Sequence, residues 1–175
     1  MANSKLFGRD EDKKQSDQVK EKQYAPGTRL PYDPALPDRL RQQHREIIQV
    51  LQDTIAAARD GKYRQVEDLL GEFQYNYQNH RFEKNQRFIP YMNHCLANNR
   101  GHSELVLKIT SATRHLDQRV IAAIGKHKQN GVTDRNRNEV VQELQQIDSD
   151  LKKHMREEDE FIYPMYRPPE AYQYS

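Results

Sequence analysis

Apolar residues recur at the three- and four-residue spacing of an amphipathic helix in four long segments, and this pattern constrains the fold more than any other feature of the chain. The segments end at helix-breaking residues, such as Gly61 after the first and Pro168 after the last. Short connections between amphipathic helices favour antiparallel packing of neighbours. The sequence therefore predicts an all-α fold, an up-down-up-down antiparallel four-helix bundle, with helices over about 33–60, 63–98, 102–126 and 134–166.

The second half of the chain repeats features of the first half. In both the second and the fourth segment a histidine is followed, at the same spacings, by a glutamate, an apolar residue and a proline. The first and third segments share a similar five-residue stretch, so the chain reads as a doubled helical hairpin. The matching residues are His80, Glu83, Phe88 and Pro90 with His154, Glu157, Ile162 and Pro164, and His44-Arg-Glu-Ile-Ile48 with His102-Ser-Glu-Leu-Val106.

Polar residues with metal-binding side chains interrupt the apolar stripes. His154 and Glu158 lie about 40° apart around the helix axis, within the apolar sector of the last segment. His44 and His80 lie within the stripes of the first two segments, and His102 lies in the first turn of the third. A buried imidazole or carboxylate needs a partner, and a cation satisfies both. Imidazole and carboxylate without thiolate suit iron, manganese or zinc, so we predict a metal site in the core.

The length and composition fit one domain with extensions. The chain has 175 residues, of which 35% are hydrophobic, enough for a small helical core. We predict that residues 33–166 form the bundle and that residues 167–175 form a C-terminal tail. Residues 1–32 are rich in charged and polar residues, so we expect an extended or mobile N-terminal arm, which could dock a protein partner.

Charge and hydropathy argue against several classes of partner. The net charge is +2, and no basic block is interleaved with aromatic residues, so we expect no nucleic-acid partner. No run of about 18 apolar residues is present and the polar N-terminus has no hydrophobic signal region, so we expect a cytoplasmic protein without a membrane span. The single cysteine, Cys95, excludes an internal disulfide and a cysteine-based zinc site, and we expect it in the core.

These histidines, glutamates and prolines resemble the pattern of the hemerythrin-like, or HHE cation-binding, family over residues 33–166. The resemblance places His44, His80, His102, His154 and Glu158 at metal-ligand positions. It implies a non-haem iron site of one or two ions in the bundle core. The functions that it implies are binding of dioxygen or nitric oxide, sensing, or iron handling.

One position departs from that family pattern. Lys84 stands four residues after His80, where the family has a glutamate, and Glu83 lies on the flank of the apolar stripe. A lysine in place of a carboxylate changes the local charge by about two units, which disfavours two metal ions in one pocket. Lys84 could instead occupy the place of the second cation and pair with Glu158. Replacing Lys84 with glutamate should then raise the metal stoichiometry.

Three classes of function remain open from the sequence. The first is a non-enzymatic protein that binds iron or a diatomic gas, and the second is a metal-free bundle that acts as a protein-interaction or signalling module. The third is an iron-dependent redox enzyme, for which no motif argues specifically, so we expect a protein that is not an enzyme.

The pattern also predicts structural or solvated places for several further residues. We expect His94, His115 and His127 in solvent, Tyr77 and Tyr91 in the core, and the run 157–160 solvated except for Glu158. Glu83 is a lesser candidate for a metal ligand, and its alternative places are the exposed flank or a position where it accepts from an imidazole N–H.

Overall fold

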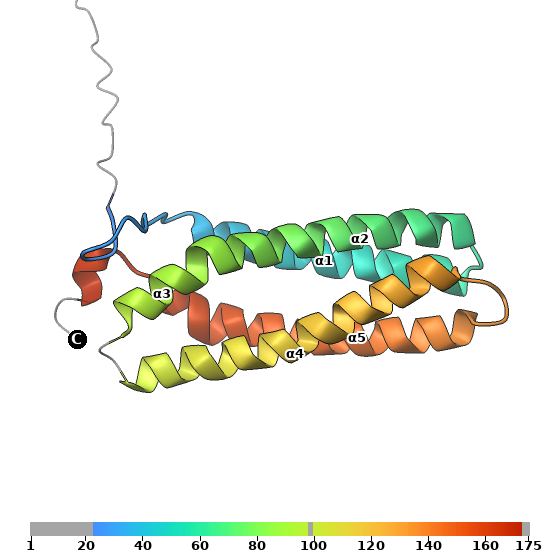
Figure 1. The fold of residues 1–175 in the computed structure, drawn as a ribbon. Helices are drawn as coiled ribbons and strands as arrows, with labels where there is room; N and C mark the ends of the chain where they lie inside the picture. Colours follow the sequence, from blue (N-terminus) through green and yellow to red (C-terminus); the bar gives the residue numbers. More distant parts are fainter. Residues whose placement is uncertain (1–22, 98–99, 173–175) are drawn as a thin grey trace, which may run out of the picture.

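The structure, a computed structural model, describes residues 23–97 and 100–172, with only the backbone described at residue 102. Four long helices pack antiparallel (Figure 1), which confirms the predicted all-α fold. Within the described ranges, no helix combines the length and the apolar content that crossing a bilayer requires. The long helices are α1 (Leu36–Arg59), α2 (Tyr63–Glu83), α4 (Arg100–Asn130) and α5 (Arg137–Glu157).

Local signals explain where the helices begin and end. Gly61 and Gly131 follow α1 and α4 with φ angles of 71° and 67°, a left-handed conformation that costs glycine little. Helix α5 begins at Arg137, later than predicted. In the turn before it, the Asn136 side chain accepts a hydrogen bond from the backbone N–H of Thr133 at 2.7 Å, so these residues form a turn and not a first helical turn.

The second and fourth helices each change to a π-helix at the same relative position. The π-helical segments begin at Lys84 and Glu158, four residues after His80 and His154. In each segment the backbone N–H that follows its last residue bonds to the carbonyl oxygen of its first residue. A proline comes two residues after each segment, and its missing N–H leaves the carbonyl four residues earlier without the α-helical partner. The duplicated sequence therefore produces a duplicated helix distortion, in the segments η1 (Lys84–Phe88) and η2 (Glu158–Ile162).

The distortion at Pro90 agrees with the predicted kink but does not end the helical path. The chain continues beyond η1 as α3 (Ile89–Cys95) and beyond η2 as the short 3₁₀ helix η3 (Tyr163–Met165). A second short 3₁₀ helix, η4 (Pro169–Tyr172), lies in the predicted C-terminal tail. Of the predicted N-terminal arm, residues 1–22 lie outside the described residues. Residues 23–32 lie against the end of the bundle, with Ala25 fully buried.

Two apolar clusters fill the core, one on each side of the polar residues. The cluster toward the turns that join α1 to α2 and α4 to α5 is mainly aliphatic and contains Leu51, Leu70 and Leu144. The cluster toward the chain termini is rich in aromatic residues and includes Phe88 and Tyr91. Burying one leucine or phenylalanine side chain completely stabilises the folded state by about 1.5–3 kcal/mol. This apolar packing offsets the cost of burying charged groups between the clusters.

Candidate metal centre

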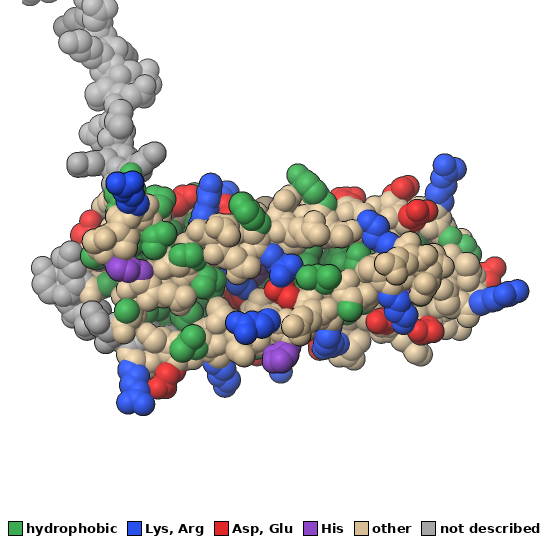
Figure 2. All heavy atoms as spheres, viewed as in Figure 1, with side chains coloured by type: hydrophobic (Ala, Val, Ile, Leu, Met, Phe, Trp, Pro, Cys, Tyr) green, Lys and Arg blue, Asp and Glu red, His purple; other side chains and the backbone are tan. Residues whose placement is uncertain are grey.

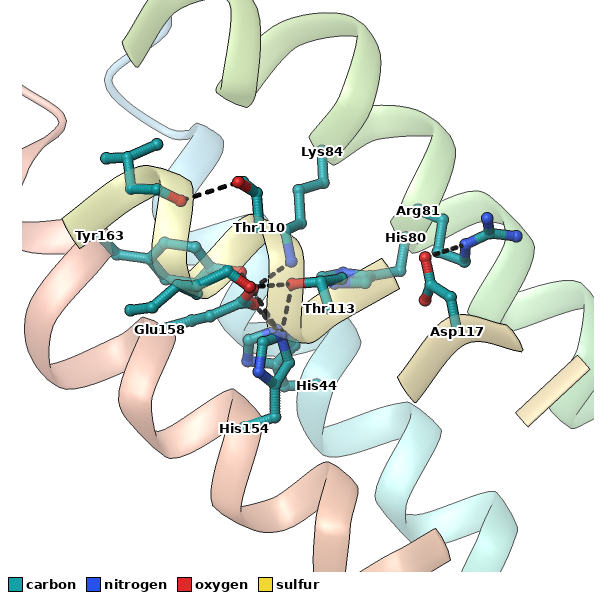
Figure 3. A network of polar contacts seen from close by, with 12 residues as sticks. His44, His80, Arg81, Lys84, Thr110, Thr113, Asp117, His154, Glu158 and Tyr163 are labelled. Carbon is teal, nitrogen blue, oxygen red and sulfur yellow. Dashed lines mark hydrogen bonds and ion pairs between the residues drawn. The ribbon is translucent and has the colours of Figure 1, made fainter. Parts of the chain in front are cut away.

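Five polar side chains, each from a different element, meet between the two apolar clusters. Helix α1 supplies His44, α2 supplies His80, η1 supplies Lys84, α5 supplies His154 and η2 supplies Glu158 (Figure 3). All five are buried, and Glu158 is only 1% exposed. Polar side chains buried to this degree require partners. The meeting of these side chains in the core explains why the apolar stripes predicted from the sequence contain histidines.

Three of these residues form a group that could hold a metal ion. One ligand atom from each of His44, His80 and Glu158 lies within 4.8 Å of the others. Donors bound at about 2.1 Å span at most about 4.2 Å across one ion, so a small movement of the side chains would complete the shell. Two imidazoles and one carboxylate form the donor set that non-haem Fe(II) proteins use with open coordination positions. The chemistry of these donors therefore fits one divalent metal ion, and iron is among the ions that it suits.

The two ring nitrogens of His44 face different carboxylates. Nδ1 of His44 is buried and has no hydrogen-bond partner among the described residues, although Asp159 Oδ1 lies 3.2 Å away. Its Nε2 lies 3.1 Å from the hydroxyl of Tyr163 and 3.4 Å from Oε2 of Glu158. Burial lowers the pKa of His44, but the neighbouring Asp159 and Glu158 carboxylates outweigh this effect and raise the pKa above its ordinary value of 6.5. The site thus attracts positive charge at His44.

Glu158 is the central residue, and its two oxygens face different partners. Oε2 accepts a hydrogen bond from Tyr163 at 3.2 Å and faces His44. Oε1 pairs with Nζ of Lys84 and lies 3.0 Å from Nε2 of His154. Burial would raise the pKa of Glu158, but Lys84 and the histidines hold it well below its usual range. Glu158 is therefore an ionised carboxylate in the centre of the bundle.

The predicted ion pair between Lys84 and Glu158 is present, and it involves only one of the two carboxylate oxygens. Lys84 Nζ lies on the Oε1 side of the carboxylate, together with His154, whereas His44 lies on the Oε2 side. A second cation bridged by Glu158 would need the Oε1 side. The ammonium group of Lys84 occupies that side and supplies one positive charge there.

The remaining predicted ligands have different surroundings. His154 lies next to Glu158, and its Nε2 is 2.8 Å from the hydroxyl of Thr113 on α4. The side chain of His102 lies outside the described residues. Position 102 falls in the first turn of α4, eleven residues, or about three helical turns, before Thr113. The ligand roles of His102 and His154 stay predictions.

Several residues of the centre were not found by sequence reasoning. Asp159 was interpreted as solvated, but it is only partly exposed and lies beside His44. Tyr163 contacts the central carboxylate from five residues further along the same helical path, and Thr113 contacts His154 from the neighbouring helix α4. Lys84 and Glu158 occupy equivalent positions in the internal repeat. This equivalence was the one sequence signal for a contact within the centre, and it identified their pairing.

The predictions for the other histidines and for Tyr77 had mixed outcomes. His94 and His115 are exposed, as expected. The prediction for His127 was wrong, because this residue is only 3% exposed and its Nε2 lies 2.9 Å from Oε2 of Glu143 on α5. It lies three residues after Ile124 on the inner side of α4. Tyr77 is in the core, as expected.

A small cavity adjoins the centre and lies next to a surface groove. The cavity has a volume of about 20 Å³, enough for roughly one water molecule, and His80, Lys84, His154 and Glu158 line it. The groove, of about 430 Å³, runs between α4 and the helical path of α2, η1 and α3. Figure 2 shows charged side chains of both signs in the furrow between these helices.

An ion pair lies where the cavity and the groove share lining residues. Arg81 Nε donates to Oδ2 of Asp117 at 2.8 Å, and the Tyr77 hydroxyl donates to Oδ1 at 2.6 Å (Figure 3 shows the ion pair). Arg81 and Asp117 line both the cavity and the groove. Burial and the adjacent Asp117 carboxylate raise the pKa of Tyr77, so its hydroxyl stays protonated. A small ligand that reached the centre from the groove would pass this ion pair.

No protein-family model, curated protein or solved structure matches this chain. The geometry and chemistry of the described residues therefore carry the functional argument. They show a four-helix bundle with a buried group of two histidines and one glutamate that could hold a metal ion.

The stability of the metal-free protein should fall in two steps as the pH is lowered. Burial, with help from His44 and Lys84, holds the pKa of His80 well below 6.5, so below about pH 6.5 the unfolded chain takes up a proton that the folded chain does not. The slope is at most about 1.4 kcal/mol per pH unit for one proton. Glu158 adds a second loss below about pH 4.5, because its folded pKa is also lowered.

Urea unfolding in the presence of a chelator, at pH values from 7.5 to 4, measures this dependence. His44 acts in the opposite direction, but its raised pKa makes that contribution complete once the pH has fallen to about 6.5. His80→Gln should remove the loss between pH 6.5 and 4.5, whereas substitution of the exposed His115 should leave it in place. An unchanged slope in His80→Gln would contradict the assignment.

Proposed function

We propose that this chain is a hemerythrin-like protein that binds one non-haem iron ion in the core of its bundle. The observation that carries the proposal is the buried donor group of His44, His80 and Glu158, whose ligand atoms come from three elements and lie within 4.8 Å of one another. The four antiparallel helices and the repeated histidine, carboxylate and proline positions agree with the family resemblance found in the sequence.

Charge supports one ion rather than two. A pair of ferrous or ferric ions needs bridging carboxylates to offset its charge, and here one candidate carboxylate position holds the ammonium group of Lys84. With the lysine in place, Glu158 offers Oε2 toward His44 while Oε1 remains paired. The centre therefore suits a single ion on the side of His44 and His80.

The residues around the donors would hold them in place. Tyr163 donates to Oε2 of Glu158, and His154 and Lys84 hold Oε1, so the carboxylate has little freedom to turn. When bound, iron with this donor set supplies an open coordination position for a small molecule such as dioxygen or nitric oxide. The adjoining cavity has room for about one water molecule, so binding a diatomic molecule would require the lining side chains to move slightly. We propose a role in binding and sensing, or in iron handling, and not in catalysis.

A specific observation favours a second candidate function. The Lys84–Glu158 ion pair balances the buried carboxylate without a metal ion, as a structural salt bridge would. In that case the bundle is a metal-free module for protein interaction or signalling. The N-terminal arm, residues 1–32, is the segment that we expected to dock a partner, and its residues 1–22 lie outside the described residues.

Elemental analysis with an absorption spectrum tests the proposed iron site. The protein is purified without added metal and measured again after anaerobic loading with Fe(II). We expect about one iron ion per chain after loading, without the charge-transfer bands of an oxo-bridged iron pair. His80→Gln should lose the iron and the exposed-residue control His115→Gln should keep it. No iron bound under either condition would refute the proposal and favour the metal-free module.

A further inference from the structure

His80 is held by a chain of hydrogen bonds that leads away from the metal centre to the outside of the bundle. Its Nδ1 lies 3.1 Å from Oε1 of Gln43, and Nε2 of Gln43 donates to Oε2 of Glu83 at 2.8 Å. Arg39 then donates to Oε1 of Glu83 through its Nε at 3.2 Å and its Nη2 at 2.9 Å. Arg39 and Gln43 are four residues apart on α1, and His80 and Glu83 are three apart on α2, so each pair shares one helix face.

The direction of these hydrogen bonds follows from the chemistry of the groups. An ionised carboxylate only accepts, so Gln43 must present its NH₂ group to Glu83. The carbonyl oxygen of the Gln43 amide then faces His80, and it can only accept. Nδ1 of His80 must therefore carry the proton. A neutral imidazole has a single N–H, so Nε2 is left with its lone pair free.

Among the described residues, no continuous chain of hydrogen bonds like this one leads from His44 or His154 to the outside of the bundle. Nε2 of His44 faces Tyr163 and Glu158, and its Nδ1 faces Asp159 without a hydrogen bond. Nε2 of His154 lies near Thr113 and Glu158. His80 is the ring whose proton position is imposed by groups that do not line the centre. Its surroundings disfavour the doubly protonated form, which fits a neutral ring with one fixed N–H.

We infer that Gln43 and Glu83 are positioning residues that hold His80 in its Nδ1–H tautomer and so reserve Nε2 for the metal ion. The part that concerns the metal rests on the proposed function, whereas the tautomer is a property of the metal-free protein. Glu83 was expected either on the flank of the helix or as an acceptor for an imidazole N–H. It reaches the imidazole through Gln43, with its side chain 17% exposed.

Nitrogen-15 NMR of histidine-labelled, chelator-treated protein tests the tautomer directly. We expect the His80 signals of the unmodified protein to show a protonated Nδ1 and an unprotonated Nε2. Gln43→Leu should shift His80 toward the Nε2–H form, because no acceptor faces Nδ1. Glu83→Gln should give a mixture of the two forms, because the Gln43 amide can then point either way. Gln42→Leu is the matched control, since Gln42 is exposed and bonds to Glu46 on the outer face of α1.

The outcomes separate this inference from the proposed function. A protonated Nε2 in the unmodified protein, or an unchanged tautomer in both Gln43→Leu and Glu83→Gln, would overturn it even if iron binds. Competition for Co(II) against a chelator tests the coordination role, and we expect Gln43→Leu to bind the metal about 10–100-fold more weakly, with Gln42→Leu unchanged. A changed tautomer with unchanged metal affinity would overturn that role. Failure of the unmodified protein to bind any metal would instead refute the proposed function and leave the tautomer assignment intact.

Discussion

Replacing Lys84 with glutamate should let the core bind a second metal ion. The substitution removes the ammonium group from the Oε1 side of Glu158 and puts a carboxylate there, next to His154. The new carboxylate, Glu158 and His154 would then offer a second set of oxygen and nitrogen donors, and the added negative charge would offset a second ion. We expect the iron content after anaerobic loading to rise from about one toward about two ions per chain.

Elemental analysis and the absorption spectrum of the loaded variant measure this change. Lys153→Glu is the control, because it changes the net charge by the same amount at an exposed position of α5. In a chelator the Lys84→Glu variant should be less stable than the unmodified protein, because two carboxylates then face each other in the core. Added metal should restore its stability. An iron content equal to that of the unmodified protein would show that Lys84 does not stand in the place of a second cation.

Replacing Glu158 with glutamine should lower the stability of the metal-free protein more than any other single substitution proposed above. The substitution keeps the shape of the side chain but leaves the buried ammonium group of Lys84 without its counter-charge. Removing one partner of a buried ion pair costs about 3–5 kcal/mol. The same substitution removes the only carboxylate of the three-residue donor group, so iron binding should be lost as well. Urea unfolding followed by circular dichroism, with a chelator present, measures the loss.

Two further variants show whether the loss comes from the unpaired charge. Glu160→Gln changes an exposed residue of the same segment and should have little effect. The double variant Lys84→Met with Glu158→Leu removes both charges, and it should regain most of the stability lost by Glu158→Gln, because well-packed apolar residues can replace a buried ion pair at little cost. A double variant as unstable as Glu158→Gln would mean that packing, and not the uncompensated charge, dominates.

The fold was predictable because its signals are local. The period of the apolar stripes identified the four helices, and Gly61 and Gly131 marked two of the connections. The helix boundaries were less certain, as α4 continues to Asn130 rather than ending near Lys126. The exact form of the distortion before Pro90 was not predictable, since a proline is compatible with a kink, a break or a π-helical turn.

The candidate site was only partly predictable because its contacts join different helices. His80 and Glu158 stood out as polar residues within apolar stripes, and the internal repeat indicated that Lys84 pairs with Glu158. Gln43 lies beside His44 in the sequence and showed no comparable signal, yet it contacts His80 on the neighbouring helix. Such contacts depend on how each helix is rotated and shifted against its neighbour, which the spacing along one helix does not specify.

The sequence alone was enough to identify the candidate donors of the centre, the internal repeat that carries them and the charge that Lys84 adds. A lysine at position 84 puts a positive charge where the first hairpin would otherwise match Glu158, whatever the details of packing. The packing of the helices shows which oxygen of Glu158 faces Lys84 and which faces His44, and that Gln43 lies between His80 and Glu83. The reason is physical, since side-chain identity and helical period are properties of one segment. Hydrogen bonds between helices depend on distances of a few ångströms that arise when the segments pack.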